Sequence, residues 1–174
     1  RIIEKDFLSR IGLKTAPYQI VDGFTSLQSA SEMIGFPAIL KTTRLGYDGK
    51  GQVRLSENSD IEKEYKKLKD NVLIYEGFVD FEFEVSVIAA RNLSGQVACY
   101  DPGQNVHLNS ILHTTTVPSQ LTSRQTVDAV LIASKILESL NYVGVLGVEL
   151  FCTKAGLIVN EIAPRVHNSG HWTQ

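Results

Sequence analysis

From Glu82 onward the hydrophobic residues recur with a period of two, and this alternation restricts the possible folds more than any other feature of the sequence. One face of the predicted strand carries Phe83, Val85, Val87 and Ala89, and the other carries Glu82, Glu84, Ser86 and Ile88. Such a pattern is typical of a strand with one buried face. Ser94-Gly95 supplies a tight turn into residues 96–100, and residues 143–152 and 156–162 form a second hairpin. We therefore expect a large antiparallel sheet.

The first half of the chain alternates short helical and strand patterns. Helices are expected at 2–11, 26–34 and 60–69, and strands at 16–21, 38–41, 52–55 and 73–78. A long helix is expected at 122–140, with a buried stripe of Val127, Val130, Leu131, Ser134, Leu137 and Leu140. The pattern predicts an α+β fold with two α/β lobes, one at about 14–76 and one formed by 1–13 and 77–174.

Composition excludes several classes of function. The chain has 174 residues, a hydrophobic content of 43% and a formal net charge of −2, with scattered basic residues, so no nucleic-acid partner is expected. No apolar run approaches the roughly 18 residues that span a bilayer, and we expect a cytoplasmic protein without a membrane partner. Cys99 and Cys152 lie far apart and lack the spacing of a zinc site.

Two glutamates in the last hairpin are the first candidates for chemistry. If the turn is centred on Ala155, Glu149 and Glu161 lie directly opposite each other. Opposed like charges destabilise a sheet unless something neutralises them, and a divalent cation held together with phosphate oxygens would do so. We therefore expect Glu149 and Glu161 to be magnesium ligands, with Asn160 as a further oxygen donor. The alternative is a register shifted by one residue, which places the carboxylates on opposite faces.

A glycine-rich segment, Gly46-Tyr47-Asp48-Gly49-Lys50-Gly51-Gln52, is the second candidate. Its glycines let the backbone approach an anion, so it suits a loop that folds over phosphates. A plain hairpin turned at Asp48-Gly49 is the alternative. Lys41 ends a buried strand and calls for an anionic partner, although a snorkelling surface lysine remains open.

The third candidate is the polar segment from Asn160 to His171. Arg165 offers a fork for a carboxylate or phosphate, and His167, Asn168 and Ser169 add donors and acceptors beside two acidic residues. We interpret this segment as an oxyanion pocket, with a solvated linker as the alternative. The backbone of Glu76-Gly77-Phe78-Val79 could read an adenine edge and Glu84 could bind ribose, whereas His107 is more often structural.

These motifs together resemble a known enzyme family. Lys41 with the segment 46–52, then Glu76-Gly77-Phe78-Val79, then Asn160-Glu161-Ile162-Ala163-Pro164-Arg165-Val166-His167-Asn168-Ser169-Gly170-His171, are similar to those of the 5-(carboxyamino)imidazole ribonucleotide synthases of purine biosynthesis. The similarity runs along the whole chain. It implies the ATP-grasp fold, with a glycine-rich lid loop between two lobes, and an ADP-forming ligase that carboxylates 5-aminoimidazole ribonucleotide by way of carboxyphosphate.

The resemblance also implies roles for individual positions. Those that match the family's ATP contacts are Arg1, Lys41, Gly46, Tyr47, Asp48, Gly49, Lys50, Gly51, Gln52, Glu76, Gly77, Phe78, Val79, Glu84, His107, Asn160 and Glu161. Glu149 and Glu161 match its metal ligands, for two Mg²⁺ ions. Tyr47 and Asp48 match positions that touch the imidazole nucleotide, and Arg165, His167, Asn168 and Ser169 match the catalytic pocket for bicarbonate and carboxyphosphate. The cofactors implied are ATP and Mg²⁺, the substrates are 5-aminoimidazole ribonucleotide and bicarbonate, and the full-length protein is expected to be a homodimer.

The chain departs from the family by its length. Family members carry a Rossmann-like domain before Arg1 and a further segment after Gln174, so we expect the isolated chain to be inactive. Another ATP-grasp ligase, of the phosphoribosylamine–glycine ligase or biotin carboxylase type, is an alternative that the terminal motif disfavours. A non-catalytic nucleotide-binding module is another, and the intact Glu149, Glu161 and Arg165 disfavour it.

Overall fold

The structure is a computed structural model that describes residues 1–44, 51–69 and 71–173, so Gly46, Tyr47, Asp48, Gly49 and Lys50 of the predicted lid lie outside the described residues. It divides into two compact units, one of Arg1–Lys5 and Ala16–Val79 and one of Asp6–Thr15 and Asp80–Gln174. Helix α1 (Ile2–Arg10) has residues in both units. Among the described residues, no helix is long and apolar enough to cross a membrane.

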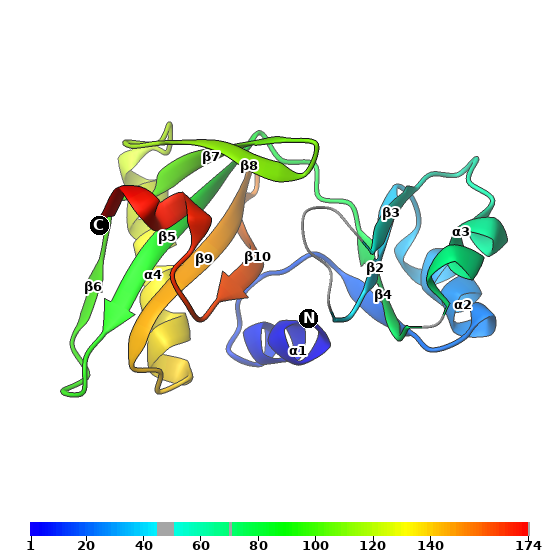
Figure 1. The fold of residues 1–174 in the computed structure, drawn as a ribbon, viewed down its shortest axis with the longest axis horizontal. Coiled ribbons are helices and arrows are strands. Elements are labelled where there is room, and N and C mark those ends of the chain that lie inside the picture. Colours follow the sequence, from blue (N-terminus) through cyan, green and yellow to red (C-terminus); the bar gives the residue numbers. More distant parts are fainter. Residues whose placement is uncertain (45–50, 70, 174) are drawn as a thin grey trace. The chain divides into compact units, whose positions relative to one another are not determined.

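The first unit is a four-stranded antiparallel sheet with two helices packed on it (Figure 1). Its elements are β1 (Tyr18–Val21), α2 (Phe24–Ile34), β2 (Ala38–Thr42), β3 (Gln52–Leu55), α3 (Ile61–Leu68) and β4 (Leu73–Gly77), with strand order β1-β4-β2-β3. Leu27 and Ala30 of α2 pack with Leu40, Leu55 and Tyr75 of the sheet in one core. The alternation of short strands and helices in the sequence thus gives one antiparallel layer covered on one face.

The ends of these two helices are fixed in different ways. Helix α2 ends at Gly35, whose φ of 81° is reached most easily by glycine. Ser26, expected to begin the helix, instead lies inside its first turn and accepts a hydrogen bond from the N–H of Gly23 at 3.0 Å. Asp60, the first residue of the helix expected at 60–69, is instead the N-cap of α3, because its carboxylate accepts from the N–H of Lys63 at 3.0 Å.

The second unit contains the large antiparallel sheet that the alternation predicted. Its elements are β5 (Phe83–Arg91), β6 (Val97–Cys99), β7 (Gly103–Leu108), β8 (Ile111–Thr116), α4 (Ser123–Ser139), β9 (Gly144–Thr153), β10 (Gly156–Ala163) and the 3₁₀ helix η1 (Asn168–Thr173). The strand order is β10-β9-β5-β7-β8, with β6 paired to β5. The predicted α+β fold with a large antiparallel sheet is confirmed.

Helix α4 covers the apolar face of this sheet, but of the predicted stripe only Leu137 is fully buried. Ala129, Ala133, Ile136 and Leu137 are buried, whereas Val127 and Leu131 are 57% and 59% exposed. The two alanines let the helix lie close against the β-branched residues of the strands, so the packing selects the small side chains rather than the largest ones. Ile3 of α1 is 82% exposed.

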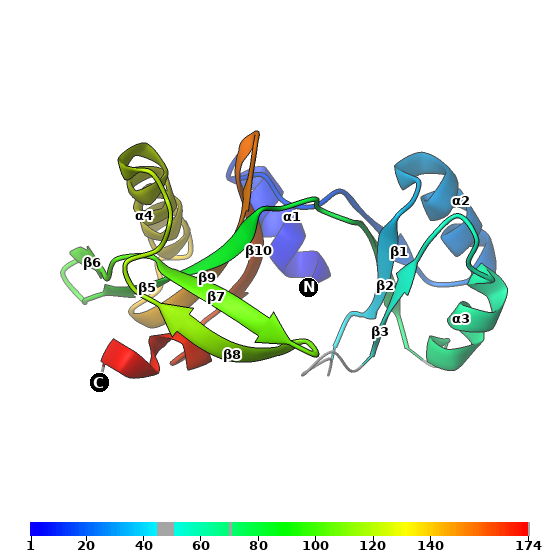
Figure 2. The same ribbon diagram turned by 90° about the horizontal axis from the view of Figure 1, so that it is seen from above.

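The opposite face of the sheet is polar and is partly covered by the end of the chain. Figure 2 shows α4 and η1 on opposite sides of the strands. The approach is close, because a Cβ placed on Gly170 would lie 2.9 Å from the side chain of Ile88. The polar face, rather than the core face, therefore carries the candidate site.

Candidate active site

The hairpin of β9 and β10 places Glu149 and Glu161 directly opposite each other, as the sequence predicted, but for a different reason. The turn pairs Gly156 with Thr153 and Val159 with Leu150, a register that would put Asn160 opposite Glu149. A β-bulge between Val159 and Glu161 shifts the pairing by one residue and brings Glu161 opposite Glu149. Bulges of this kind re-aim side chains next to functional sites.

Glu149 is a carboxylate held among other carboxylates. Its side chain is only 15% exposed, and burial, together with the charges of Glu161 and Glu84, raises its pKa from 4.5 to about 7. The amide of Asn160 donates to its Oε2 at 3.2 Å and partly offsets the cost. The site therefore concentrates negative charge that a bound cation would relieve.

The donor set suits magnesium. Within the ranges that the structure describes, no three His, Cys, Asp or Glu side chains are grouped as a metal cage. Mg²⁺ rarely uses such cages, because it is bound by one or two carboxylates together with water and substrate phosphates. Two opposed glutamates and a nearby amide oxygen match that preference, and burial beside Glu161 and Glu84 raises the pKa of Glu149, so a cation would favour its ionised form.

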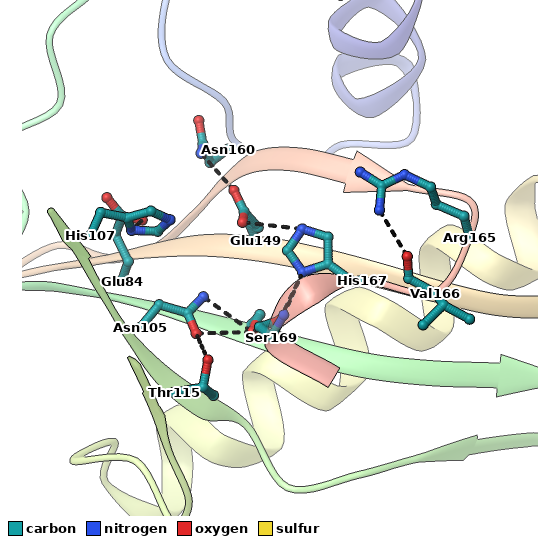
Figure 3. Close-up of polar contacts among 11 residues, drawn as sticks. Glu84, Asn105, His107, Thr115, Glu149, Asn160, Arg165, Val166, His167 and Ser169 are labelled. Atoms are coloured by element: carbon teal, nitrogen blue, oxygen red, sulfur yellow. Dashed lines mark hydrogen bonds and ion pairs between the residues drawn. The ribbon is translucent and has the colours of Figure 1, made fainter. Parts of the chain in front are cut away.

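Glu84 and His107 form a second pair on the same face. The Nδ1 atom of His107, on β7, lies 3.1 Å from Oε2 of Glu84, on β5 (Figure 3). This hydrogen bond to Glu84 raises the pKa of His107, against a smaller opposing effect of burial. The structure therefore joins His107 directly to one of the carboxylates that surround Glu149.

The terminal segment divides into buried and exposed residues. Nε2 of His167 lies 3.4 Å from Oε1 of Glu149, and its Nδ1 lies 2.8 Å from Oγ of Ser169. Arg165 and Asn168 are exposed, and the guanidinium of Arg165 donates to the carbonyl of Val166 at 2.8 Å (Figure 3). The four residues predicted to share one pocket thus form a buried pair and an exposed pair.

Glycine at position 147 permits the close approach of His167. A Cβ on Gly147 would lie 2.8 Å from the Cβ of His167, a distance that real side chains do not reach. Burial lowers the pKa of His167, and the charge of Arg165 adds to this effect. The imidazole therefore lies neutral against β9, next to Glu149.

Sequence reasoning missed three residues that connect to this pair. The hydroxyl of Ser86 donates to Ser169 at 2.6 Å, the amide of Asn105 donates to Ser86 at 3.2 Å, and the hydroxyl of Thr115 donates to Asn105 at 2.9 Å. Ser86 lies on the same polar face of the alternating strand as Glu84, and this position is the sequence signal that could have identified it as a site residue. Its burial, with 2% exposed, depends on the chain end that covers it.

In the first unit, Glu76 is the centre of a buried charge cluster. Its carboxylate lies 2.8 Å from Nζ of Lys41 and 3.5 Å from Nζ of Lys5, and all three side chains are at most 12% exposed. Burial alone would raise the pKa of Glu76, but the two lysines outweigh it and lower the pKa, with a smaller contribution from Arg1. Burial lowers the pKa of Lys5. The cluster holds one more lysine than carboxylate, which suits an anionic ligand.

Lys5 is the residue that sequence reasoning missed in this cluster. It lies three positions before the buried Leu8 on helix α1, so a lysine on an apolar stripe was the signal. Five further residues of this unit that were predicted to contact ATP do not belong to this charge cluster. Gly51 directly precedes β3, which begins at Gln52. The N–H groups of Gly77 and Phe78 donate to the carbonyls of Pro17 and Pro37, and Val79 follows them in the sequence. Those two N–H groups are therefore already used within the unit.

Comparison with known families identifies the domain type. The family model described as the ATP-grasp domain matches residues 6–174, which is nearly the whole chain. The N5-carboxyaminoimidazole ribonucleotide synthase of Brucella melitensis is 49% identical over 177 residues, covering 100% of this chain and 49% of that protein.

Solved structures give the same result. The crystal structure of an N5-carboxyaminoimidazole ribonucleotide synthetase in complex with ADP has a TM-score of 0.95 at 40% identity, covering 99% of this chain and 46% of that one. An N5-carboxyaminoimidazole synthase from Aspergillus clavatus, in complex with ADP and 5-aminoimidazole ribonucleotide, has a TM-score of 0.85 at 27% identity, covering 97% and 44%. This chain therefore spans about half the length of the proteins it resembles.

Proposed function

Because this chain belongs to the ATP-grasp family, we propose that it carries the ATP- and metal-binding centre of an enzyme that converts 5-aminoimidazole ribonucleotide to 5-(carboxyamino)imidazole ribonucleotide. The observation that carries the proposal is the opposition of Glu149 and Glu161 across a β-bulge, with the pKa of Glu149 raised to about 7. The related structures that contain ADP, and in one case 5-aminoimidazole ribonucleotide, support the choice of nucleotide and substrate.

The reaction would proceed in two stages. A bicarbonate oxygen attacks the γ-phosphorus of ATP, the bond to the β–γ bridging oxygen breaks, and ADP leaves with that electron pair. The carboxyphosphate then loses phosphate and gives carbon dioxide, and the exocyclic amine of the substrate adds to its carbon and releases a proton. Protein groups form no covalent bond in this scheme, so they act by positioning and by neutralising charge.

In the second unit, Glu149, Glu161 and the amide oxygen of Asn160 would hold magnesium. The ion would neutralise phosphate oxygens and fix their orientation. Glu84 and His107, joined at 3.1 Å, would contact the nucleotide, as the family resemblance implies. The exposed Arg165 and Asn168 are available to bicarbonate. The buried His167 contacts Glu149 and is itself held by Ser169, so this pair is suited to keeping the Glu149 side chain in place.

In the first unit, Lys41 would contact ATP phosphates. Glu76 holds Lys41 at 2.8 Å and Lys5 contributes a second positive charge to the same carboxylate. The side chains that carry this excess positive charge are at most 12% exposed. Solvent ions would therefore screen their attraction for a bound anion only weakly. We add Lys5 to the residues proposed to support nucleotide binding.

The decisive experiment measures ADP formation by the full-length parent protein. Turnover should require 5-aminoimidazole ribonucleotide and bicarbonate together, and phosphoribosylamine with glycine, or biotin with bicarbonate, should not replace them. Glu161→Gln should reduce kcat at least about 100-fold, while Glu138→Gln, an exposed change on α4, should leave it unchanged. Turnover with another amine, or full activity of the Glu161 variant, would refute the proposal.

A cytoplasmic location and a homodimeric parent enzyme also belong to this proposal. ATP and a phosphorylated metabolite are substrates available in the cytoplasm, and the dimer follows only from the family resemblance. Light scattering of the full-length protein measures the mass directly, and a monomer at micromolar concentration would exclude the dimer.

A further inference from the structure

A continuous chain of hydrogen bonds runs through the polar face of the large sheet. It connects Thr115 on β8, Asn105 on β7 and Ser86 on β5 to Ser169 and His167 of the terminal segment (Figure 3). Ser86, Asn105, His167 and Ser169 are between 1% and 9% exposed, so bulk water does not compete for their donors and acceptors. Buried polar networks of this kind specify one arrangement when every member has a partner.

In the unchanged protein, a long contact from the backbone indicates the direction of the chain at its His167 end. The N–H of Ser169 points to Nδ1 of His167 at 3.4 Å, and a backbone N–H can only donate. Nδ1 therefore accepts, and the hydroxyl of Ser169 donates to the same nitrogen at 2.8 Å. The ring proton is then on Nε2, which faces Oε1 of Glu149 at 3.4 Å.

The direction is fixed at the other end by the amide of Asn105. Since the hydrogen of Ser169 is used by His167, the hydroxyl of Ser86 must donate to Ser169, at 2.6 Å. Ser86 then accepts from the NH₂ group of Asn105 at 3.2 Å, and the amide oxygen accepts from Thr115 at 2.9 Å. That oxygen is also 3.4 Å from the Ser86 hydroxyl, but the single hydrogen of Ser86 makes the shorter bond.

Hydroxyl groups can reverse their role by rotating, but an amide has distinct donor and acceptor ends. Asn105 is therefore the side chain that sets the direction of the whole chain. Reversal would put a proton on Nδ1 and turn the lone pair of Nε2 toward the carboxylate of Glu149. When Glu149 is ionised, the repulsion between this lone pair and the carboxylate would turn the Glu149 side chain away from His167.

We propose that Asn105 is a positioning residue that, through Ser86 and Ser169, holds His167 as the tautomer whose Nε2–H faces Glu149. The inference rests on the proposed function only for its consequence, which is the orientation of a metal ligand. Partners behind a metal ligand commonly change activity or affinity by 10- to 100-fold. Nothing in the positions of Asn105 or Ser86 requires either residue to touch a substrate.

The test is the tautomer of His167, read from the ¹⁵N resonances of its two ring nitrogens in the substrate-free chain. The variant Asn105→Asp replaces the NH₂ donor of Asn105 with a carboxylate oxygen, which can only accept. Its spectra are recorded at a pH where the ¹³C resonance of the new carboxyl group shows that it is ionised. Ser86 should then donate to the introduced carboxylate, Ser169 to Ser86, and Nδ1 of His167 should gain a proton. Thr116→Asp places the same charge at an exposed position of β8, outside the chain of hydrogen bonds, and should change nothing.

A second variant keeps the test independent of the first. Ser86→Ala removes the hydroxyl that connects Asn105 to Ser169. In the double variant Ser86→Ala/Asn105→Asp, Nδ1 of His167 should therefore be unprotonated again. The inference is overturned by any of three results: a proton on Nδ1 in the unchanged chain, a bare Nδ1 in the ionised Asn105→Asp variant, or an effect of Asn105→Asp that persists without Ser86.

Activity of the parent enzyme separates this inference from the proposed function. Asn105→Asp should lower kcat about 10- to 100-fold with little change in the KM for ATP. If the tautomer responds as expected but the parent enzyme does not carboxylate the ribonucleotide, only the proposed function fails. If the enzyme is active and the tautomer does not respond, only the role of Asn105 fails.

Discussion

Replacing Glu149 with glutamine should stabilise the metal-free protein at alkaline pH. Glutamine has nearly the same shape as glutamate but carries no charge. Its single oxygen can accept from Nε2 of His167, and its NH₂ group then replaces the oxygen that faces Asn160, whose own amide oxygen can accept from it. In the folded chain this carboxylate is buried beside Glu161 and Glu84, and its pKa is raised from 4.5 to about 7. The ionised form is therefore held in the fold at a cost that the unfolded chain does not have.

The size of the effect follows from the two pKa values. Between pH 4.5 and about 7 the folded state binds more protons at this site than the unfolded state, so stability falls as the pH rises through this window. At 1.36 kcal/mol for each pKa unit, the full effect above pH 8 is about 3 kcal/mol, of which less than about 1 kcal/mol is present at pH 5. Glu149→Gln should therefore gain about 2 to 3 kcal/mol at pH 8.5 and little at pH 5.

Urea unfolding in the presence of a chelator measures this difference. Trp172 is the only tryptophan of the chain and packs against Tyr100 in the second unit, so its fluorescence reports on the unit that contains Glu149. Glu138→Gln removes an exposed charge from the same unit and is the matched control. Each variant is measured at both pH values, because other groups also titrate and only the difference between variants isolates position 149.

Two results would refute the reasoning. One is an equal stability of Glu149→Gln and the unchanged protein at pH 8.5, and the other is a gain that does not decline at pH 5. Addition of Mg²⁺ extends the test, since a ligand that binds only the folded state stabilises it by an amount that grows with the logarithm of 1 + [Mg²⁺]/Kd. The unchanged protein should gain stability from Mg²⁺, and the glutamine variant should gain less.

Three further predictions concern other parts of the fold. Gly147→Ala should displace His167 and cost about 1 to 3 kcal/mol in urea unfolding, because its Cβ would lie 2.8 Å from that of His167; an unshifted His167 ¹⁵N spectrum would contradict this. Leu137→Ala should cost about 2 to 5 kcal/mol and Leu131→Ala less than about 0.5 kcal/mol, since the first is fully buried and the second 59% exposed; equal losses would restore the predicted stripe. Glu76→Gln should cost about 3 kcal/mol at neutral pH, measured by amide exchange in the first unit, because its two lysines lose their counter-charge. The pKa of Glu76 is lowered, so this contribution is present above the unfolded value near 4.5 and is lost as the pH falls through the folded pKa; a variant with unchanged acid sensitivity would argue against it.

Local sequence signals were sufficient for most of the elements, but they did not predict β7, β8 or the 3₁₀ helix η1. The alternation after Glu82 predicted the large sheet, and the helices expected at 26–34 and 60–69 correspond to α2 and α3. The stripe of α4 could not be obtained in this way, because hydrophobicity favours Leu131 while close packing favours Ala129 and Ala133. Periodicity states that a helix has a buried face, but the partner surface decides which residues lie on it.

The candidate site shows the same division more sharply. The sequence by itself determined that the chain is an ATP-grasp domain, and it determined the identity of the two opposed glutamates, since both lie in one hairpin. The β-bulge at Asn160 that actually opposes them was decided only by the tertiary structure. The same holds for Lys5 beside Glu76 and for the hydrogen bonds from Asn105 to His167. These contacts join residues far apart in the sequence, and their geometry depends on strand register and on the burial of a polar face by the end of the chain, neither of which a local pattern encodes.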